Sequence, residues 1–212
     1  MRLDRDSFLL YAVTDRTWTG RQNLYEQVES ALKGGVTLLQ LREKNVSDEA
    51  FLEEAVRMKK LCDDYQVPLI INDRVDVALK CGAAGVHLGQ EDGNVSEVRR
   101  RVGERLLIGV SAHNVKEALL AQEQGADYLG VGAVFGSSTK KDAHPLDHAV
   151  LREICQAVSI PVVAIGGITK ANVTLLKGTG IDGAALISAI FAARDVEAEC
   201  RELKEILEGV VS

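Results

Sequence analysis

The chain has 212 residues, of which 46% are hydrophobic and 26% charged, and its formal net charge is −6 at pH 7. This composition is typical of a soluble globular protein and excludes a disordered chain, while the acidic excess argues against a general nucleic-acid binder. No apolar run is long enough for a membrane span, and the start, MRLDRD, lacks the apolar core of a secretory signal, so we predict a cytoplasmic protein.

Eight short apolar runs with the character of strands recur along the chain. In order they are FLLYAVTD, VTLLQLREK, VPLIIND, AGVHLGQED, LLIGVSA, DYLGVGAVF, PVVAIGG and DGAALISAI. Between them, stretches such as residues 22–35, 47–65 and 114–126 have apolar residues at intervals of three and four, which predicts helices. Strands rich in Val, Ile and Leu that alternate throughout with helices predict a parallel sheet covered on both faces.

A weak repeat favours closure of this sheet into a barrel. Four segments run from a helix-ending glycine into a strand, and these glycines are Gly35, Gly82, Gly125 and Gly180. Their spacing corresponds to about two strand–helix units, and eight units form a TIM (β/α)8 barrel, for which about 200 residues is the compact limit. We therefore predict one α/β domain, a TIM barrel over residues 1–212. The alternative, an open doubly wound sheet, is disfavoured because residues 130–136, GVGAVFG, lack the G-x-G-x-x-G spacing.

Polar side chains gather where the predicted strands end. TIM-barrel active sites are assembled from residues at the carboxyl ends of the strands. The polar residues there are Gln40, Arg42, Lys44, Asn72, Asp73, Arg74, His87, Gln90, Glu91, Asp92, Ser111, Ser137, Thr139, Lys140 and Lys141. Each alone is as compatible with a loop or helix cap, because Asp, Asn and Ser are common helix starters. Their coincidence at one end of the barrel predicts a functional site.

The second strand shows which way these side chains face. Side chains alternate along a strand, so Gln40, Arg42 and Lys44 share one face while Leu39 and Leu41 occupy the other. In an open antiparallel sheet the polar face would meet solvent. In a closed barrel it meets the mouth, where Arg42 and Lys44 are expected to bind an anion.

The last two strands predict a second anion site. Gly166 and Gly167 allow backbone amides to approach a ligand closely, and a short helix is expected to begin at Ser188. Loops after the seventh and eighth strands, with such a helix amino terminus, form the recurrent phosphate site of these barrels. The alternative for the glycines is tight packing at a bend.

Two carboxylates, Asp73 and Asp92, are predicted to lie at the mouth among the cations Arg42, Lys44 and Lys140. They are compatible with a general acid and base pair or with a Mg²⁺ site. The neighbouring cations favour ionised carboxylates, which suits metal ligation better than a proton-donating acid. A diphosphate bridged by Mg²⁺ would also match the surplus positive charge.

The chain resembles the thiamin phosphate synthase family over nearly its whole length. The motifs that carry the resemblance are, in order, YAVTD, QLREK, NDRVDVAL, GVHLGQED, IGVSA, YLGVGAVFGSSTKK, VVAIGGI and LISAI. The resemblance implies a transferase of thiamin biosynthesis that joins a hydroxymethylpyrimidine diphosphate to a thiazole phosphate, with Mg²⁺ as cofactor and release of pyrophosphate. It also implies a dissociative step, in which the diphosphate leaves before the thiazole nitrogen attacks.

The resemblance further implies residue roles, and Arg42, Lys44, Ser111 and Lys140 are predicted to be catalytic. In full, it places Arg42, Lys44, Asn72 and Lys140 on the diphosphate, Asp73 and Asp92 on Mg²⁺, Gln40 and His87 near the pyrimidine, Ser111 near the leaving group, Ser137 and Thr139 on the thiazole side, and Gly167, Ile187 and Ser188 around the thiazole phosphate. The family pattern GPxxPT is altered at residues 132–137, where two prolines are absent and Ser replaces Thr. This change is expected to act on loop rigidity and on the KM for the thiazole substrate.

Two other functions are weighed against this one. A related thiazole tautomerase of the same fold would not need the full set of Mg²⁺ and diphosphate residues, and a noncatalytic phosphate sensor would be expected to have lost its polar mouth. Small-molecule substrates are the expected partners, with no nucleic acid and no membrane. The basic cluster at residues 99–105 is interspersed with glutamates and is predicted to be a solvated helix face. The sequence leaves open the form of the thiazole substrate. It also leaves open the oligomeric state, and a homodimer is compatible with the sequence.

Overall fold

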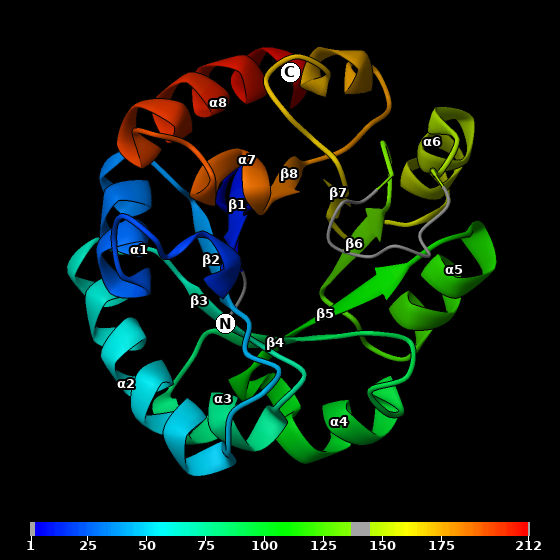
Figure 1. The fold of residues 1–212 in the computed structure, drawn as a ribbon. Helices are drawn as coiled ribbons and strands as arrows, with labels where there is room; N and C mark the ends of the chain where they lie inside the picture. The colour runs from blue at the N-terminus through cyan, green and yellow to red at the C-terminus, as the bar shows by residue number, and fades with distance from the viewer. Residues whose placement is uncertain (1–2, 137–144, 212) are drawn as a thin grey trace.

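The computed structural model describes residues 3–136 and 145–211. Eight parallel strands close into a barrel in chain order, with β1 paired to both β2 and β8 (Figure 1). The strands are β1 (Leu10–Val13), β2 (Leu38–Leu41), β3 (Leu69–Asn72), β4 (Gly85–Leu88), β5 (Leu107–Ala112), β6 (Tyr128–Gly132), β7 (Val162–Ile165) and β8 (Gly183–Leu186). The predicted TIM barrel is confirmed.

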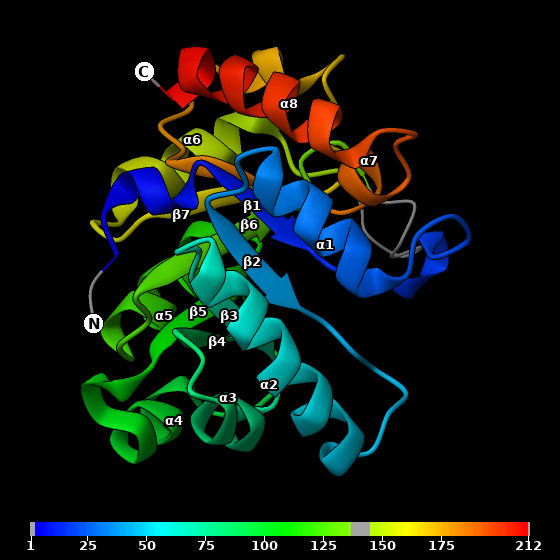
Figure 2. The same ribbon diagram turned by 90° about the vertical axis from the view of Figure 1, so that its left-hand side faces the viewer.

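Helices surround the ring of strands. They are α1 (Leu24–Lys33), α2 (Asp48–Asp64), α3 (Val75–Cys81), α4 (Val95–Val102), α5 (Val115–Glu123), α6 (His148–Ala157), α7 (Ser188–Phe191) and α8 (Val196–Val211), with 3-10 turns η1 (Arg5–Phe8), η2 (Arg16–Trp18), η3 (Gly103–Arg105) and η4 (Val173–Leu176). The short helix expected at Ser188 is present as α7. Figure 2 shows β2 pointing toward the side of the barrel on which α7 and the loop between β1 and α1 lie.

Strict alternation of strand and α-helix fails between β7 and β8. The described chain there contains only the 3-10 turn η4 (Val173–Leu176). Two glycines that follow it, Gly178 and Gly180, have φ angles of 78° and 91°, in the left-handed region that ends helices. A tight crossover therefore replaces the predicted helix.

The core has two layers that reflect the alternation along each strand. Leu39 and Leu41 face outward and belong to the larger cluster, which also contains Phe51 and Ala55 of α2. Leu38 belongs to the smaller cluster inside the barrel. Because alternate residues share a face, Gln40 is directed into the barrel, as predicted from the sequence.

Aromatic and imidazole side chains fill part of the barrel interior, and two glycines give them space. A Cβ atom on Gly109 of β5 would lie 2.1 Å from the Tyr128 ring, and one on Gly130 of β6 would lie 3.0 Å from Cε1 of His87. Real Cβ contacts are longer than this, so glycine is required at position 109 for Tyr128 to occupy the interior. The interior is thus shaped around Tyr128 and His87.

The basic cluster of α4 differs from its prediction. The Arg99 side chain is only 20% exposed, and its guanidinium donates to the carbonyl of Gly125 and pairs with Asp127. Its Nη1 also donates to the carbonyl of Leu106 at 3.1 Å. Arg99 therefore ties α4 to the amino-terminal ends of β5 and β6, whereas Arg100 remains exposed. The prediction of a solvated face was wrong for Arg99.

A separate finding concerns membranes: among the helices of residues 3–136 and 145–211, none combines the length and the apolar character that a bilayer crossing requires.

Candidate active site

The structure brings the described candidate residues to the carboxyl-terminal mouth of the barrel. Gln40, Asn72, His87 and Ser111 lie in the strands β2, β3, β4 and β5, and the remaining residues follow strand ends: Arg42, Lys44, Asp73, Asp92, Gly167, Ile187 and Ser188. Ser137, Thr139 and Lys140, predicted after β6, lie outside the described residues.

A continuous chain of hydrogen bonds crosses the barrel interior from β2 to β5. The Gln40 side-chain amide donates to the Tyr11 hydroxyl at 2.7 Å, and the hydroxyls of Tyr11 and Tyr128 lie 2.9 Å apart. The Tyr128 hydroxyl lies 3.1 Å from Nδ1 of His87, whose Nε2 lies 3.1 Å from Oγ of Ser111. Three of the predicted site residues are therefore linked through two tyrosines.

The partners of the two phenols determine the direction of this chain. Burial raises the pKa of both Tyr11 and Tyr128, so both hydroxyls keep their protons and must donate. Tyr11 accepts from Gln40, so we infer that it donates to Tyr128 and that Tyr128 in turn donates to Nδ1 of His87. In a neutral imidazole the proton is then on Nε2 and is donated to Ser111. The Ser111 hydroxyl proton is left to point at a ligand.

Two carboxyl groups face each other at the ends of β3 and β4. Burial, followed by contact with the Asp92 carboxyl, raises the pKa of Asp73 to about 6, and Lys44 and Asn72 act in the opposite direction. The Asp73 backbone has a φ of 61°, uncommon outside glycine, and its amide donates to the carbonyl of His87 at 2.9 Å. On the other side, the Gly89 amide donates to the Asp92 carboxylate at 2.7 Å.

This carboxylate pair fits a hard divalent cation. Mg²⁺ is usually held by one or two carboxylates together with water and substrate phosphate oxygens, not by a full cage of side chains. Over residues 3–136 and 145–211 there is no group of three or more His, Cys, Asp or Glu side chains placed to hold a metal. Two acidic oxygen donors beside Lys44 thus match a metal that is shared with an anionic substrate.

Arg42 is fixed through both its backbone and its side chain. Its amide donates to Oγ1 of the fully buried Thr14 at 3.0 Å, which extends the pairing of β1 with β2. Its guanidinium lies 3.9 Å from the carboxylate of Asp15, the residue after Thr14. Asp15 thus partly balances the Arg42 charge while leaving donor groups for an anion.

The predicted phosphate site lies at the adjacent ends of β7 and β8. Gly166 and Gly167 have φ angles of 104° and 66°, and a Cβ on Gly167 would lie 2.8 Å from the carbonyl oxygen of Gly136. Tight packing at a bend, the alternative interpretation, is therefore present. Ile187, at the amino end of α7, provides no side-chain cap for the helix that starts at Ser188. A helix start without such a cap is compatible with an anion as its partner.

Sequence reasoning missed Tyr11, Tyr128 and Asp15. Both tyrosines lie within apolar strands, where their rings fit the strand pattern. A phenol on the inward face of a barrel strand needs a hydrogen-bond partner when buried, and this requirement was the available signal. Asp15 closes the motif YAVTD, directly after the first strand, where an acidic residue could have been included with the other strand ends.

The fold and the polar mouth together are those of a TIM-barrel enzyme. The family model of thiamine monophosphate synthase matches residues 10–190. The chain belongs to this family and is a transferase of thiamine biosynthesis.

Individual relatives agree with the family match. The chain is 52% identical to the thiamine-phosphate synthase of Clostridium tetani, over 92% of this chain and 93% of the relative. It is 50% identical to the thiamine-phosphate synthase of Clostridium botulinum, over 93% of each chain. The solved structure of the thiamine phosphate pyrophosphorylase from Pyrococcus furiosus superposes with a TM-score of 0.90 at 40% identity, over 98% of this chain and 99% of that chain.

The direction of the hydrogen-bond chain can be tested by NMR. In the unliganded protein we expect His87 to carry its proton on Nε2, because Tyr128 donates to Nδ1. The change Tyr128→Phe removes that donor and should give a mixture of tautomers in the imidazole ¹⁵N spectrum. Tyr25→Phe, on α1 and outside the chain of hydrogen bonds, is the matched control. A proton on Nδ1 of His87 in the unchanged protein would contradict this direction.

Proposed function

We propose that the chain is a thiamin phosphate synthase. It would condense 4-amino-2-methyl-5-hydroxymethylpyrimidine diphosphate with 4-methyl-5-(2-phosphoethyl)thiazole and release pyrophosphate. With the carboxylate of that thiazole as substrate, CO2 would be released as well. The observation that supports this best is the juxtaposition of Asp73 and Asp92 beside Lys44. Such a site suits a diphosphate with a metal ion, which a simple isomerase of a thiazole phosphate does not need.

The proposed reaction is dissociative. The bond between the pyrimidine methylene carbon and the diphosphate oxygen breaks first, and its electron pair leaves with the diphosphate. The lone pair of the thiazole nitrogen then forms the new carbon–nitrogen bond. No side chain has to act as a nucleophile, so the protein contributes chiefly by stabilising the growing negative charge and by holding the two substrates in contact.

Groups from the ends of four strands would bind the departing diphosphate. Arg42 and Lys44 supply positive charge from the end of β2, and Asn72 supplies an amide from the end of β3. Lys140, which lies outside the described residues, is proposed to act with them. Ser111, with its hydroxyl proton free of His87, would donate to the leaving group. Charge that increases on the diphosphate strengthens each of these contacts in the transition state.

Asp73 and Asp92 would hold Mg²⁺ at the edge of this anion site. When bound, Mg²⁺ supplies positive charge that favours departure of the diphosphate. The facing carboxyl groups repel each other when both are ionised, and the raised pKa of Asp73 reflects burial together with this contact. A divalent cation between the two groups would relieve that repulsion.

The pyrimidine and the thiazole would occupy different parts of the mouth. Gln40 and His87, linked through the buried tyrosines, are proposed to lie near the pyrimidine. The thiazole phosphate would bind at Gly167, Ile187 and Ser188. Ser137 and Thr139 are proposed on the thiazole side, outside the described residues.

The proposed activity is tested by product formation. Purified protein with both substrates and Mg²⁺ should form thiamin phosphate and pyrophosphate, each measured against a control without enzyme. Assays with the decarboxylated thiazole phosphate and with its carboxylate will identify the preferred form. Isomerisation of the carboxylate without condensation would instead indicate a tautomerase. Substrate binding with neither reaction would indicate a noncatalytic sensor.

The role of Asp92 is tested by substitution. Asp92→Ala should lower kcat by about a hundredfold or more, because it removes one of the two proposed metal ligands. Glu91→Ala, at the adjacent exposed carboxylate, is the matched control and should retain activity. Unchanged turnover of Asp92→Ala at limiting Mg²⁺ would remove this residue from the mechanism.

A further inference from the structure

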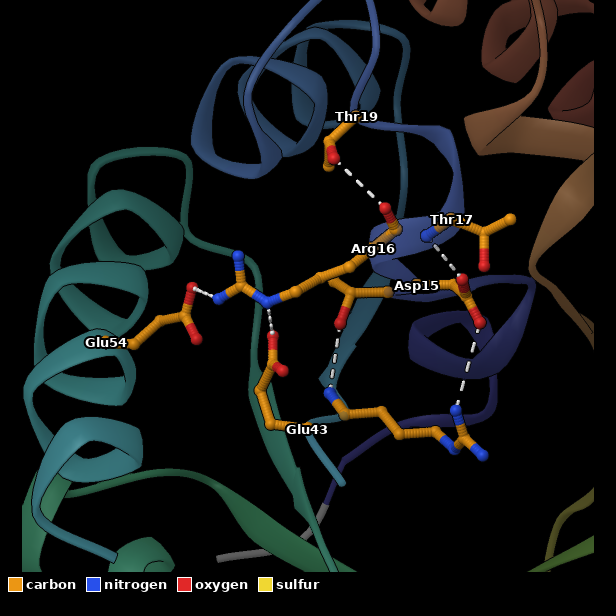
Figure 3. Close-up of polar contacts among 8 residues, drawn as sticks. Asp15, Arg16, Thr17, Thr19, Glu43 and Glu54 are labelled. Atoms are coloured by element: carbon orange, nitrogen blue, oxygen red, sulfur yellow. Dashed lines mark hydrogen bonds and ion pairs between the residues drawn. The ribbon is translucent and has the colours of Figure 1, made fainter. Parts of the chain in front are cut away.

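One polar bridge beside the mouth has no role in the chemistry above. Arg16, in η2 directly after β1, donates from Nε to the Glu43 carboxylate and from Nη2 to the Glu54 carboxylate, both at 2.6 Å (Figure 3). Glu43 follows β2, and Glu54 lies on α2. We call Arg16, Glu43 and Glu54 the Arg16 bridge. It joins three elements of the barrel through one guanidinium.

Glu43 is the buried member of this bridge. Its side chain is 5% exposed, whereas that of Arg16 is 52% exposed. Burial, and then repulsion from Glu54, raises the pKa of Glu43, and Arg16 opposes both effects. A buried carboxylate without a partner is strongly disfavoured. Without Arg16, Glu43 and Glu54 would face each other with no cation between them, and Glu43 would have to move toward water or take up a proton.

Movement of Glu43 would carry its two neighbours with it. Glu43 lies between Arg42 and Lys44 in the chain, but its carboxylate is directed to other partners. It contacts Arg16 and Glu54, whereas Arg42 lies near Asp15 and Lys44 acts on Asp73. The bridge therefore anchors the outward side of a segment whose inward side presents both proposed diphosphate ligands. Glu43 itself has no contact with the mouth cations that would replace this anchor, since its partners in the described chain are Arg16 and Glu54.

The loop that carries Arg16 is also tied to the inward side of the same segment. The Asp15 carboxylate accepts a hydrogen bond from the Thr17 amide at 2.8 Å, which caps η2 (Figure 3). The same carboxylate group lies 3.9 Å from the Arg42 guanidinium. Asp15 and Arg16, which are neighbours in one loop, thus contact Arg42 and Glu43. Asp15 contacts Arg42 from the mouth side, and Arg16 contacts Glu43 from the outer side.

We propose that Arg16 is a positioning residue for the diphosphate site: through Glu43 and Glu54 it holds the segment at residues 42–44 so that Arg42 and Lys44 face the anion together. This proposal rests on the function proposed above. Fixing the segment before binding removes part of the ordering entropy that two long cationic side chains would otherwise lose on meeting the anion. Because Glu43 is buried, loss of Arg16 is expected to lower stability as well, so binding is the readout that reports positioning.

The test is a double-mutant cycle on binding of inorganic pyrophosphate with Mg²⁺, measured by calorimetry. Arg16→Gln should weaken binding by about tenfold, because interacting residues of one network couple at this scale. In a protein that already carries Arg42→Ala and Lys44→Ala, Arg16→Gln should lower pyrophosphate affinity little further. The groups that Arg16 positions are then already absent. Equal loss in both backgrounds would mean that Arg16 contacts the anion directly and would overturn the positioning role.

Two control variants separate positioning from general destabilisation. Arg99→Gln breaks another partly buried arginine–carboxylate contact, at the opposite end of the barrel, and should leave pyrophosphate affinity unchanged. Arg16→Lys keeps the charge but cannot bridge both carboxylates in the same fork, so intermediate affinity is expected, and it also serves if Arg16→Gln does not fold. Affinity for the thiazole phosphate should be unaffected in both Arg16 variants.

The outcomes for Arg16 and for the proposed function are distinguishable. If the unchanged protein does not bind pyrophosphate, the diphosphate site itself is wrong. If the unchanged protein binds pyrophosphate and Arg16→Gln and Arg16→Lys bind it equally well, only the positioning role is wrong.

Discussion

Closure of the barrel between β1 and β8 is the constraint on which the mouth depends. β1 has only four residues, yet it pairs with β2 on one side and with β8 on the other. Since all eight strands are parallel, closure brings every carboxyl end to one rim, whatever the distance in sequence. Asp15 and Ser188, at opposite ends of the chain, thereby belong to the same rim. An open sheet would spread these groups along an edge and leave no common site.

Within the closed barrel, polar groups are arranged by depth. Deep in the interior the polar side chains satisfy one another, as in the chain from Gln40 through two tyrosines to His87. At the rim the balance changes, because carboxylates and cations of residues 3–136 and 145–211 lie close together without being fully paired with one another. There the pKa of Asp73 is raised to about 6, with Lys44 acting against burial and Asp92. Satisfied polar groups fix a shape, whereas incompletely paired charges provide affinity for a ligand.

Much of the fold and part of the site were predictable from the sequence. The apolar runs predicted the eight strands, and alternation along β2 predicted that Gln40 faces inward while Leu39 faces outward. Contacts between distant segments were not predictable in this way. Periodicity gives the face of a residue but not its partner, so the bonds of Tyr11 to Tyr128 and of Arg16 to Glu43 appear only in three dimensions. For the same reason Arg99 was assigned to solvent, although its partners lie on the loops before β5 and β6.

The central claim is that Asp73 and Asp92 recruit Mg²⁺ to a diphosphate at this rim. Its most direct test is calorimetric binding of inorganic pyrophosphate with and without Mg²⁺, at about pH 7.5 and about pH 5. Mg²⁺ should strengthen binding at the higher pH. The gain should shrink at the lower pH, because Asp73, with a pKa of about 6, is then mostly protonated and a poor metal ligand. The variant Asp73→Asn controls for protonation of pyrophosphate itself. In this variant Mg²⁺ should give no gain in pyrophosphate affinity at either pH. Equal affinity with and without Mg²⁺ at pH 7.5 would contradict the claim.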